Sequence, residues 1–527
     1  MKKNLVLFAI VFLSICIGFF LGSEKEILMS DQQNSWSMNR LERLMRYIEN
    51  DYVDEIDTDS LVGEVIEEIV NRLDPHSVYI PARERQSIAE NMQGNFSGIG
   101  VSFFMYKDSV TIIRVLEGGP SEAVGLLAGD RILIANEDTL FQKNYSSEKI
   151  MYSLKGKPGT SIDLTMYRKS EDKVFQLEMK RGKVPLPSVD SYYLMDETVG
   201  YLKINRFSQT TYDEFDLALS DLISKGMEKL ILDLRDNPGG YLHTAIQISN
   251  SLLQKDQTIV ITKSKMGEEE KSISDGNGDF QEGDLIVLVN EQSASASEIV
   301  AGAIQDNDRG WIIGRRTFGK GLVQKQMSLG GGDAVRLTIA KYFTPTGRSI
   351  QKPYNLDRET YYKGLINRYP SAEISNAKKN PFNDSLAYKT PKGRTVYGGG
   401  GITPDFYISN KKTEQENFNS LILNSNMMNN FVFEEVDNNR KKFNGLEMEY
   451  LLKGEFEDLL PWHDLLVKYC ADKKIEITVQ EQETFKAVKA YLGLQLFGVN
   501  TFNQMKNQDD LFLEIAINTL DSLSQIN

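Results

Sequence analysis

The sequence predicts an α/β protein with a core of strand–helix units, an inserted unit made mainly of strands, and helical segments at either side. Strand and helix patterns alternate over residues 198–345, which indicates a sheet with parallel pairing. Short strands separated by turns fill residues 94–182, whereas apolar residues at helical spacing mark 35–90 and 411–527. A chain of 527 residues is too long for one compact core, so we expect several domains.

The composition is that of an ordinary globular protein, with 41% hydrophobic and 25% charged residues. The formal net charge of −14 and the lack of a long Lys/Arg run argue against a nucleic-acid partner. The two cysteines, Cys16 and Cys470, offer no disulfide framework. There are three histidines, His76, His243 and His463, and neither a CxxC pair nor an HExxH motif is present. We therefore expect no metal or other cofactor, and chemistry that does not depend on histidine.

The N-terminal segment, residues 1–24, has two lysines before an uncharged apolar run, Leu5–Gly22. This pattern is typical of a secretory signal or of an uncleaved membrane anchor. No A-x-A cleavage site follows, which favours the anchor and hence membrane association of the N-terminus. Lipidation of Cys16 is disfavoured because Ile15 before it is bulky. We expect the protein in the cell envelope, on its periplasmic side, either secreted or anchored.

An N-terminal helical region is predicted over residues 35–90. RLERLMRYIENDYV and LVGEVIEEIVNRL have helical apolar spacing, and LDPHSVYI breaks the helix at Pro75. His76, next to this proline, is interpreted as a turn or packing residue.

Residues 91–182 are predicted to form one domain of short strands with the helix SSEKIMYSLKG. A glycine-rich loop, GIGV, precedes one of its strands; it consists of Gly98, Ile99, Gly100 and Val101. The N–H groups of such a loop can bind the terminal carboxylate of a peptide, while the strand edge pairs with the peptide backbone. For this loop alone, a plain β-turn is the alternative. The order of the segments, with GGPSEAVGLLAGDRILIAN after the loop, resembles a PDZ domain.

The core domain is predicted over residues 188–410. The buried strands KLILDLRD and DLIVLVN are followed by NPGG and SASASE, and ligands of parallel sheets bind beyond the carboxyl ends of the strands. Residues 352–397 are polar and irregular, so we expect a surface insertion there. Residues 411–527 follow as a helical extension in which we find no motif.

Ser295 lies between the strand DLIVLVN and the helix that follows it. As local sequence, Ser295 and Glu298 match an S-x-x-E capping box. The functional interpretation is a nucleophile exposed at the helix start, where the N–H of Ala296 would point at a developing oxyanion. Gly240 of the neighbouring NPGG turn offers a second donor, because it lets substrate approach the backbone.

GRRTFGKGLVQ, residues 314–324, has the glycine and lysine spacing of a phosphate-binding loop. A nucleotide-dependent protein is therefore one alternative. Against it, Gly321 stands where such a loop has Ser or Thr to bind magnesium. The pattern after the loop also predicts a β-hairpin around GGG, where a phosphate-binding lysine would begin a helix.

Lys320 is instead predicted to be the general base for Ser295. This role requires a pKa lowered from about 10.4 to near 7, which desolvation among apolar neighbours can supply. Gln324 could orient the amine without adding a charge that would stabilise the ammonium form. An exposed hairpin lysine is the alternative, and a second Ser-Lys pattern, Ser146 with Lys149, is interpreted as chance because no SDN follows.

Seven segments occur along the chain in this order: LDPHSVY, the PDZ stretch, DLRDNPGG, SASASEIVAGAIQD, TFGKGLVQ, YFTPTGRSIQ and GGGITPD. Together they resemble the carboxyl-terminal processing, or tail-specific, proteases of the S41 serine-peptidase family. The resemblance implies a crotonase- or ClpP-like protease core with an inserted PDZ domain. It also implies a Ser-Lys mechanism, with Ser295 as nucleophile, Lys320 as base, and Gln324 orienting the lysine. The oxyanion donors would be the N–H groups of Gly240 and Ala296.

We therefore expect a serine endopeptidase of the cell envelope that processes the C-terminal tails of proteins through an acyl-enzyme. Its partners would be proteins or peptides with apolar C-termini, and an adaptor protein or a second copy of the chain are further candidates. The alternative is a non-catalytic PDZ scaffold that binds the C-termini of partner proteins.

Overall fold

The computed structural model describes residues 39–143, 145–354, 358–366, 384–409, 414–443 and 445–524. The apolar run predicted as a signal or anchor lies outside these ranges. Within them, no helix is both long and apolar enough to cross a membrane. The chain divides into two compact units, Met1–Leu73 and Asp74–Asn527.

In its described part, residues 39–73, the first unit contains two helices, as predicted. One covers 39–51 and the other is α2, Thr58–Asn71. The side chain of Asp57 accepts a hydrogen bond from the N–H of Ser60 and thereby caps the start of α2.

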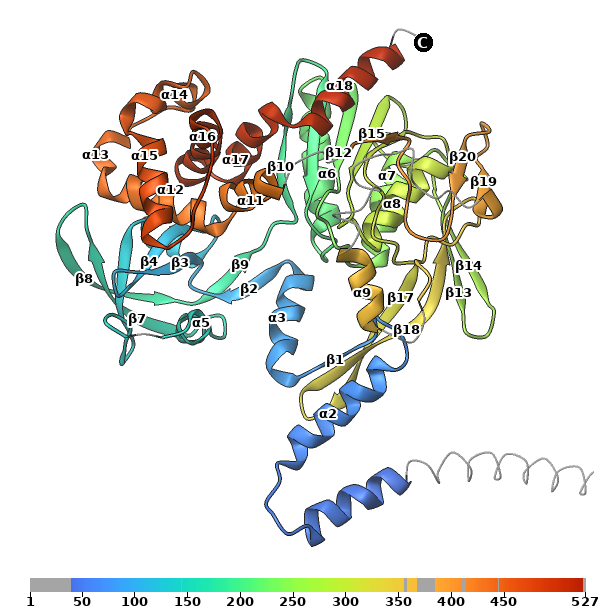
Figure 1. Cartoon of the computed structure of the whole chain (residues 1–527), viewed down its shortest axis with the longest axis horizontal. Helices are drawn as coiled ribbons and strands as arrows, with labels where there is room; N and C mark the ends of the chain where they lie inside the picture. The colour runs from blue at the N-terminus through green and yellow to red at the C-terminus, as the bar shows by residue number, and fades with distance from the viewer. Residues whose placement is uncertain are drawn as a thin grey trace, which may run out of the picture. The chain divides into compact units, whose positions relative to one another are not determined.

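The second unit is built on a six-stranded sheet that confirms the predicted α/β core (Figure 1). Its strands from β11 to β21 run parallel, and β10 is antiparallel to β11. In spatial order the strands are β10 (Val189–Leu194), β11 (Val199–Ile204), β12 (Lys229–Asp233), β15 (Asp284–Val289), β16 (Trp311–Gly314) and β21 (Phe406–Tyr407).

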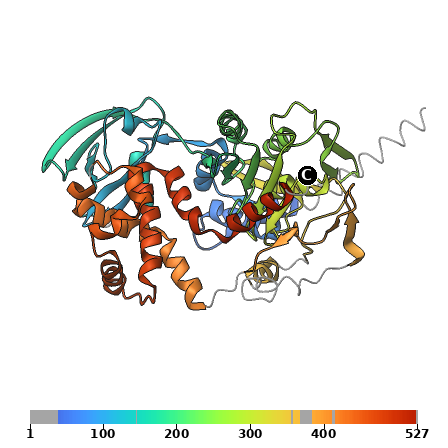
Figure 2. The same cartoon turned by 90° about the horizontal axis from the view of Figure 1, so that it is seen from above.

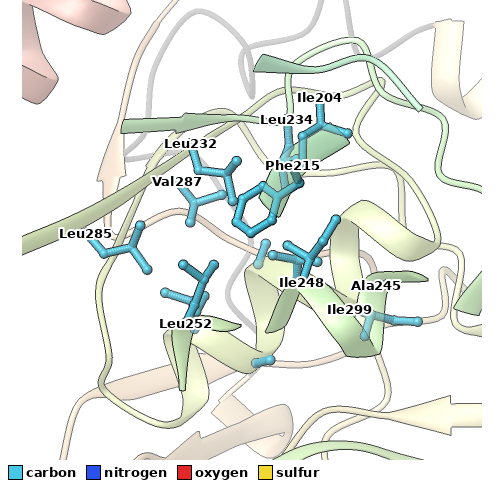
Figure 3. Close-up of a cluster of buried hydrophobic side chains, with 14 of the residues drawn as sticks. Ile204, Phe215, Leu232, Leu234, Ala245, Ile248, Leu252, Leu285, Val287 and Ile299 are labelled. Atoms are coloured by element: carbon cyan, nitrogen blue, oxygen red, sulfur yellow. The ribbon is translucent and has the colours of Figure 1, made fainter. Parts of the chain in front are cut away.

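Three helices pack on one face of this sheet: α6 (Thr211–Ser224), α7 (Leu242–Leu252) and α8 (Ala296–Asp306). Phe215, Ile248 and Ile299, one from each helix, gather against strand residues such as Leu232 and Val287 (Figure 3). The side chains of β12 and β15 that point to the opposite face of the sheet pack against α18 (Leu511–Ser524). Because both faces of the sheet are covered, the sequences of these strands are continuous apolar runs. Each fully buried aliphatic side chain contributes about 1.5–3 kcal/mol to the stability of the fold.

A second, five-stranded sheet contains the predicted hairpin, β17 (Leu322–Gly330) and β18 (Asp333–Phe343). The hairpin turns at the triple glycine, where Gly330 pairs with Asp333. The other strands are β13 (Thr258–Ser264), β14 (Glu269–Ile273) and β1 (Val78–Ile80). Strand β1 lies inside the region predicted as helical, and it is held in the sheet by antiparallel pairing with residues 334–336 of β18.

The inserted unit has the predicted strands, turns and short helix. Helix α3 (Ala82–Gln93) leads into it, and α5 (Ser147–Leu154) is the predicted SSEKIMYSLKG helix. Its other elements are β2 (Asn95–Gly98), β3 (Val101–Tyr106), β4 (Ser109–Val115), α4 (Pro120–Ala123), β5 (Asp130–Ala135), β6 (Asp138–Thr139), β7 (Ser161–Arg168), β8 (Lys173–Lys180) and β9 (Gly182–Pro185).

Within 352–397, the described residues 358–366 and 384–397 are more regular than the polar composition predicts. It contains α9 (Arg358–Ile366), and β19 (Ala387–Lys389) pairs with β20 (Thr395–Tyr397) as a hairpin. Tyr361 of α9 is only 4% exposed, because it packs against the ring of His76. The expectation of irregular structure is therefore wrong for these described parts, whereas the surface insertion stays a prediction.

The C-terminal extension is helical, as predicted, and it contacts both the inserted unit and the core (Figures 1 and 2). Asp437 forms an ion pair of 2.6 Å with Arg131 of β5, and Asp510 forms one of 2.6 Å with Arg235 after β12. The helices before α18 are α11 (Glu414–Leu423), α12 (Asn426–Asn438), α13 (Arg440–Phe443), α14 (Met448–Leu452), α15 (Trp462–Asp472), α16 (Glu481–Phe497) and α17 (Val499–Lys506).

Candidate active site

Ser295 forms a sharp elbow between β15 and α8. Its backbone has φ 55° and ψ −112°, a conformation that costs a non-glycine residue about 1–3 kcal/mol and persists only where the surroundings enforce it. The neighbouring serines supply that enforcement. The hydroxyl of Ser293 donates to the carbonyl of Leu234 at 2.8 Å, and that of Ser297 donates to the carbonyl of Asn237 at 2.9 Å. Ser293 and Ser297 thus use their hydroxyls to hold the elbow at whose tip Ser295 lies.

The NPGG turn lies directly against this elbow. A Cβ at Gly239 would lie 2.6 Å from the carbonyl oxygen of Ala294 and 2.8 Å from the nitrogen of Ala296. Gly239 has φ +94° and Gly240 has φ +153°, so both positions favour glycine. The side chain of Asn237 fixes the turn, because it accepts from the N–H of Gly239 at 2.9 Å. The structure therefore brings Gly240 and Ala296, the two predicted oxyanion donors, to adjacent segments.

Lys320 lies just before β17, and its amine contacts the predicted orienting residue. Its Nζ donates to Oε1 of Gln324 at 2.8 Å, and Nε2 of Gln324 donates to the carbonyl of His76 at 2.7 Å. Burial lowers the pKa of Lys320 from 10.5 to about 8, and the nearby charge of Arg336 acts in the same direction. About one molecule in ten would then carry a neutral amine at about pH 7. The lysine leads into a strand, whereas a phosphate-binding lysine would open a helix.

Glu298 has contacts that the sequence does not predict, because the local motif indicates only a capping box with Ser295. Its carboxylate accepts from the backbone N–H groups of Ser295 and Lys320, both at 2.9 Å, through the same oxygen, Oε2. The other oxygen accepts from the hydroxyl of Thr317 at 2.5 Å and from the N–H of Gly319 at 2.8 Å. Burial raises the pKa of Glu298 to about 7, against these four donors, which favour the charged form.

Tyr342 of β18 makes a second connection between the two segments. Its hydroxyl lies 3.0 Å from the carbonyl oxygen of Ser295 and within hydrogen-bond distance of that of Lys320. A phenol has one hydrogen, so it donates to one carbonyl at a time. Among the described residues no hydrogen bond joins the Lys320 amine to the Ser295 hydroxyl. A proton can pass between them only after a closer approach, and such contacts commonly tighten when substrate binds.

His76 packs beside Lys320. The ring is 7% exposed and lies edge-on to Phe318 and Tyr361, with centroid distances of 6.1 and 5.2 Å. Burial, together with the charge of Lys320, lowers the pKa of His76 to about 4. The imidazole is therefore neutral near neutral pH, and its backbone carbonyl holds Gln324 in place.

The four predicted loop residues, Gly98 to Val101, line a separate groove of about 320 Å³ between β3 and α5. The carbonyl oxygens of Ile99 and Gly100 accept from the N–H groups of Ser121 and Leu116, at 2.9 and 3.0 Å. The loop is thus fixed, and it is not a free turn. The other lining residues of the groove are Ser87, Glu90, Asn91, Phe96, Phe103, Met151, Leu154, Lys155 and Leu186.

Comparison with known protein families assigns two of these regions. Residues 198–359 match peptidase family S41 and residues 97–179 match the PDZ domain. Residues 418–498 match a family of unknown function, DUF8443.

A carboxy-terminal-processing protease of Bartonella bacilliformis is 33% identical over 356 residues, which cover 66% of this chain and 80% of that protein. A probable CtpA-like serine protease of Staphylococcus aureus strain N315 is 33% identical over 325 residues, or 61% of this chain. That match spans 63% of the staphylococcal protein's length. The chain belongs to the carboxy-terminal-processing proteases of peptidase family S41.

Among solved structures, the photosystem II D1 C-terminal processing protease covers 69% of this chain and 85% of its own, with 23% identity and a TM-score of 0.36. A putative S41 protease from Bacteroides fragilis covers 50% of this chain and 77% of its own, with 18% identity and a TM-score of 0.32.

Proposed function

We propose that this protein is a serine endopeptidase that uses Ser295 as its nucleophile and Lys320 as its general base. One observation carries the proposal. The strained serine and a half-buried lysine of lowered pKa are both tied, through their backbones, to a single oxygen of Glu298. Strained backbone and a perturbed lysine concentrate at functional sites, and here they share one anchor.

The mechanism follows from these positions. Oγ of Ser295 attacks the carbonyl carbon of a peptide bond while the neutral amine of Lys320 takes its proton. The oxyanion that forms accepts hydrogen bonds from the N–H groups of Gly240 and Ala296, and the N-terminus of α8 adds its dipole. The ammonium of Lys320 then protonates the leaving amine. Water hydrolyses the resulting ester between Ser295 and the substrate, which regenerates the serine and releases a carboxylic acid.

The proposed substrates are proteins whose C-terminal tails are apolar. The PDZ domain supports this class, because its groove is lined mainly by apolar side chains and ends at a glycine-rich loop suited to a carboxylate. We place the activity in the cell envelope on the strength of the apolar run Leu5–Gly22. Ordering of the amine by Gln324 would keep the lone pair of Lys320 available to Ser295.

The test is proteolysis of an unfolded, apolar-ended substrate by Ser295→Ala and Lys320→Ala proteins, with labelling by a serine-directed phosphonate. Both variants are expected to lose cleavage, and only the parent and Lys325→Ala proteins to react with the phosphonate. Lys325 is the matched control because it is an exposed lysine on β17, the strand that follows Lys320. Cleavage by Ser295→Ala at the parent rate contradicts the proposal. Peptide binding without cleavage or labelling of the parent would identify a PDZ scaffold.

A further inference from the structure

The PDZ groove contains an ion pair that none of the roles described so far uses. Lys155 and Glu90 are the two charged residues among its described lining residues, and Nζ of Lys155 lies 2.5 Å from Oε2 of Glu90. Their side chains are 21% and 11% exposed. Removing two charges from water costs free energy, so a nearly buried ion pair in an otherwise uncharged groove indicates a function.

Lys155 stands where the end of a bound peptide would lie. It is the C-cap residue of α5, and its Cα would be 3.6 Å from a Cβ placed on Gly98, the first residue of the glycine-rich loop. Its ammonium also lies 5.3 Å from the ring centroid of Phe96. Lys155 therefore lines the same groove as the loop whose N–H groups suit a terminal carboxylate.

Glu90 reaches the groove from outside the matched PDZ domain. It belongs to α3, and its second oxygen accepts from Nε2 of Gln86 at 3.1 Å. The same helix is attached to the hairpin that follows Lys320, because Arg85 donates to the carbonyl of Gly332 at 3.2 Å. The carboxylate that pairs with the Lys155 ammonium therefore comes from α3, a helix that also contacts the hairpin of the protease core.

We propose that Lys155 is the counter-ion for the C-terminal carboxylate of a substrate, and that Glu90 is a built-in competitor which that carboxylate displaces. The proposal rests on the proposed function, since it assumes that the groove binds substrate tails. An incoming carboxylate has the same charge and donor requirement as Glu90, so the two compete for one ammonium. An amide-ended peptide has no charge with which to compete.

The competition predicts opposite effects for the two partners. Glu90→Gln leaves Lys155 free, so binding of a carboxylate-ended peptide tightens about three- to tenfold. Lys155→Gln removes the counter-ion, so binding of the same peptide weakens about tenfold or more. A pair that merely supports the fold of the groove would make both variants bind more weakly.

The experiment measures fluorescence anisotropy on full-length protein with the Ser295→Ala substitution, which prevents cleavage. The probe is a short fluorescein-labelled peptide ending in Leu-Val, with either a free carboxylate or a C-terminal amide. Glu84→Gln on α3 and Lys149→Gln on α5 are matched controls, because each changes an exposed charge on the same helix as its test residue.

Tighter carboxylate binding by Glu90→Gln, weaker binding by Lys155→Gln and no change in the controls support the proposal. The Glu90→Gln/Lys155→Gln double variant should bind the acid peptide about as weakly as Lys155→Gln does, because Glu90 has no ammonium left to occupy. Equal tightening for the amide peptide, or changes of the same sign in both single variants, overturn it. If the parent binds neither peptide, the proposed tail recognition itself fails, whereas Ser295-dependent cleavage is judged separately.

Discussion

Gln324 offers the sharpest test of what keeps the pKa of the candidate base, Lys320, low. Replacing it by glutamate changes an amide to a carboxylate of nearly the same shape. Oε1 already lies 2.8 Å from Nζ of Lys320. Two unit charges at that distance attract by about 6 kcal/mol at an effective dielectric constant of about 20. Burial of the carboxylate and its repulsion from the carbonyl of His76 offset much of this attraction.

We expect Gln324→Glu to raise the pKa of Lys320 from about 8 to between about 9 and 11. The base acts as the neutral amine, so kcat/KM rises with pH through this pKa. At about pH 7 the neutral fraction, and with it kcat/KM, should fall about 10- to 1000-fold. Activity should recover as the pH is raised through the new pKa.

The assay is kcat/KM for an internally quenched peptide, measured from about pH 6 to about pH 11. Gln324→Met is the matched control, because it also loses the hydrogen bond to His76 but adds no charge. It should lower the rate while its midpoint stays at or below about pH 8. A Gln324→Glu profile with an unshifted midpoint, or one identical to that of Gln324→Met, would refute the assignment of Lys320 as the titrating base.

Three further predictions concern groups that support the site and the extension. Glu298→Gln should lower the unfolding free energy, measured by urea denaturation, by about 2–4 kcal/mol and should abolish cleavage. The reason is that the amide nitrogen cannot accept a hydrogen bond from the donors that it would face. A stable, active variant would contradict this. Gly240→Ala places a Cβ 2.0 Å from a carbonyl oxygen and should eliminate activity, whereas Gly393→Ala, with φ +87° and no atom within 4 Å, should leave kcat/KM unchanged. Asp437→Ala leaves the buried Arg131 unpaired and should destabilise the protein by about 3–5 kcal/mol, seen as a lower midpoint of thermal unfolding. An unchanged midpoint would mean that this ion pair does not hold the extension.

Local sequence predicted the elements that carry the site, because each is a continuous pattern. The buried strand and helix around Ser295 and the hairpin after Lys320 can be read from a few adjacent residues. The capping motif likewise identified Glu298 as a partner of Ser295. Its contacts with Thr317 and Lys320 could not be predicted, because those residues are 19 and 22 positions away and only the fold brings them to one carboxylate.

The features that sequence reasoning missed depend on still longer separations. The carbonyl of His76 reaches Gln324 across 248 positions, and a backbone carbonyl has no sequence signature. Strand β1 consists of only three residues, too few for a periodic pattern, and exists because β18 offers an edge. Tyr361 lies in a polar segment whose composition does not predict a buried residue, yet its ring is buried against the distant His76.

The shared carboxylate of Glu298 has a consequence for how this site can change over evolutionary time. Glu298 contacts the backbones of both Ser295 and Lys320, and Tyr342 makes a second connection, so their relative placement is fixed by these contacts as well as by the chain between them. Insertions between the two residues can therefore be neutral as long as they leave that carboxylate in place. Substitution of the glutamate, by contrast, removes a contact from both backbones at once and is expected to displace both residues. The candidate nucleophile and the candidate base are therefore expected to change together, and a lineage that loses the glutamate is expected to keep the fold of the PDZ domain but not the chemistry.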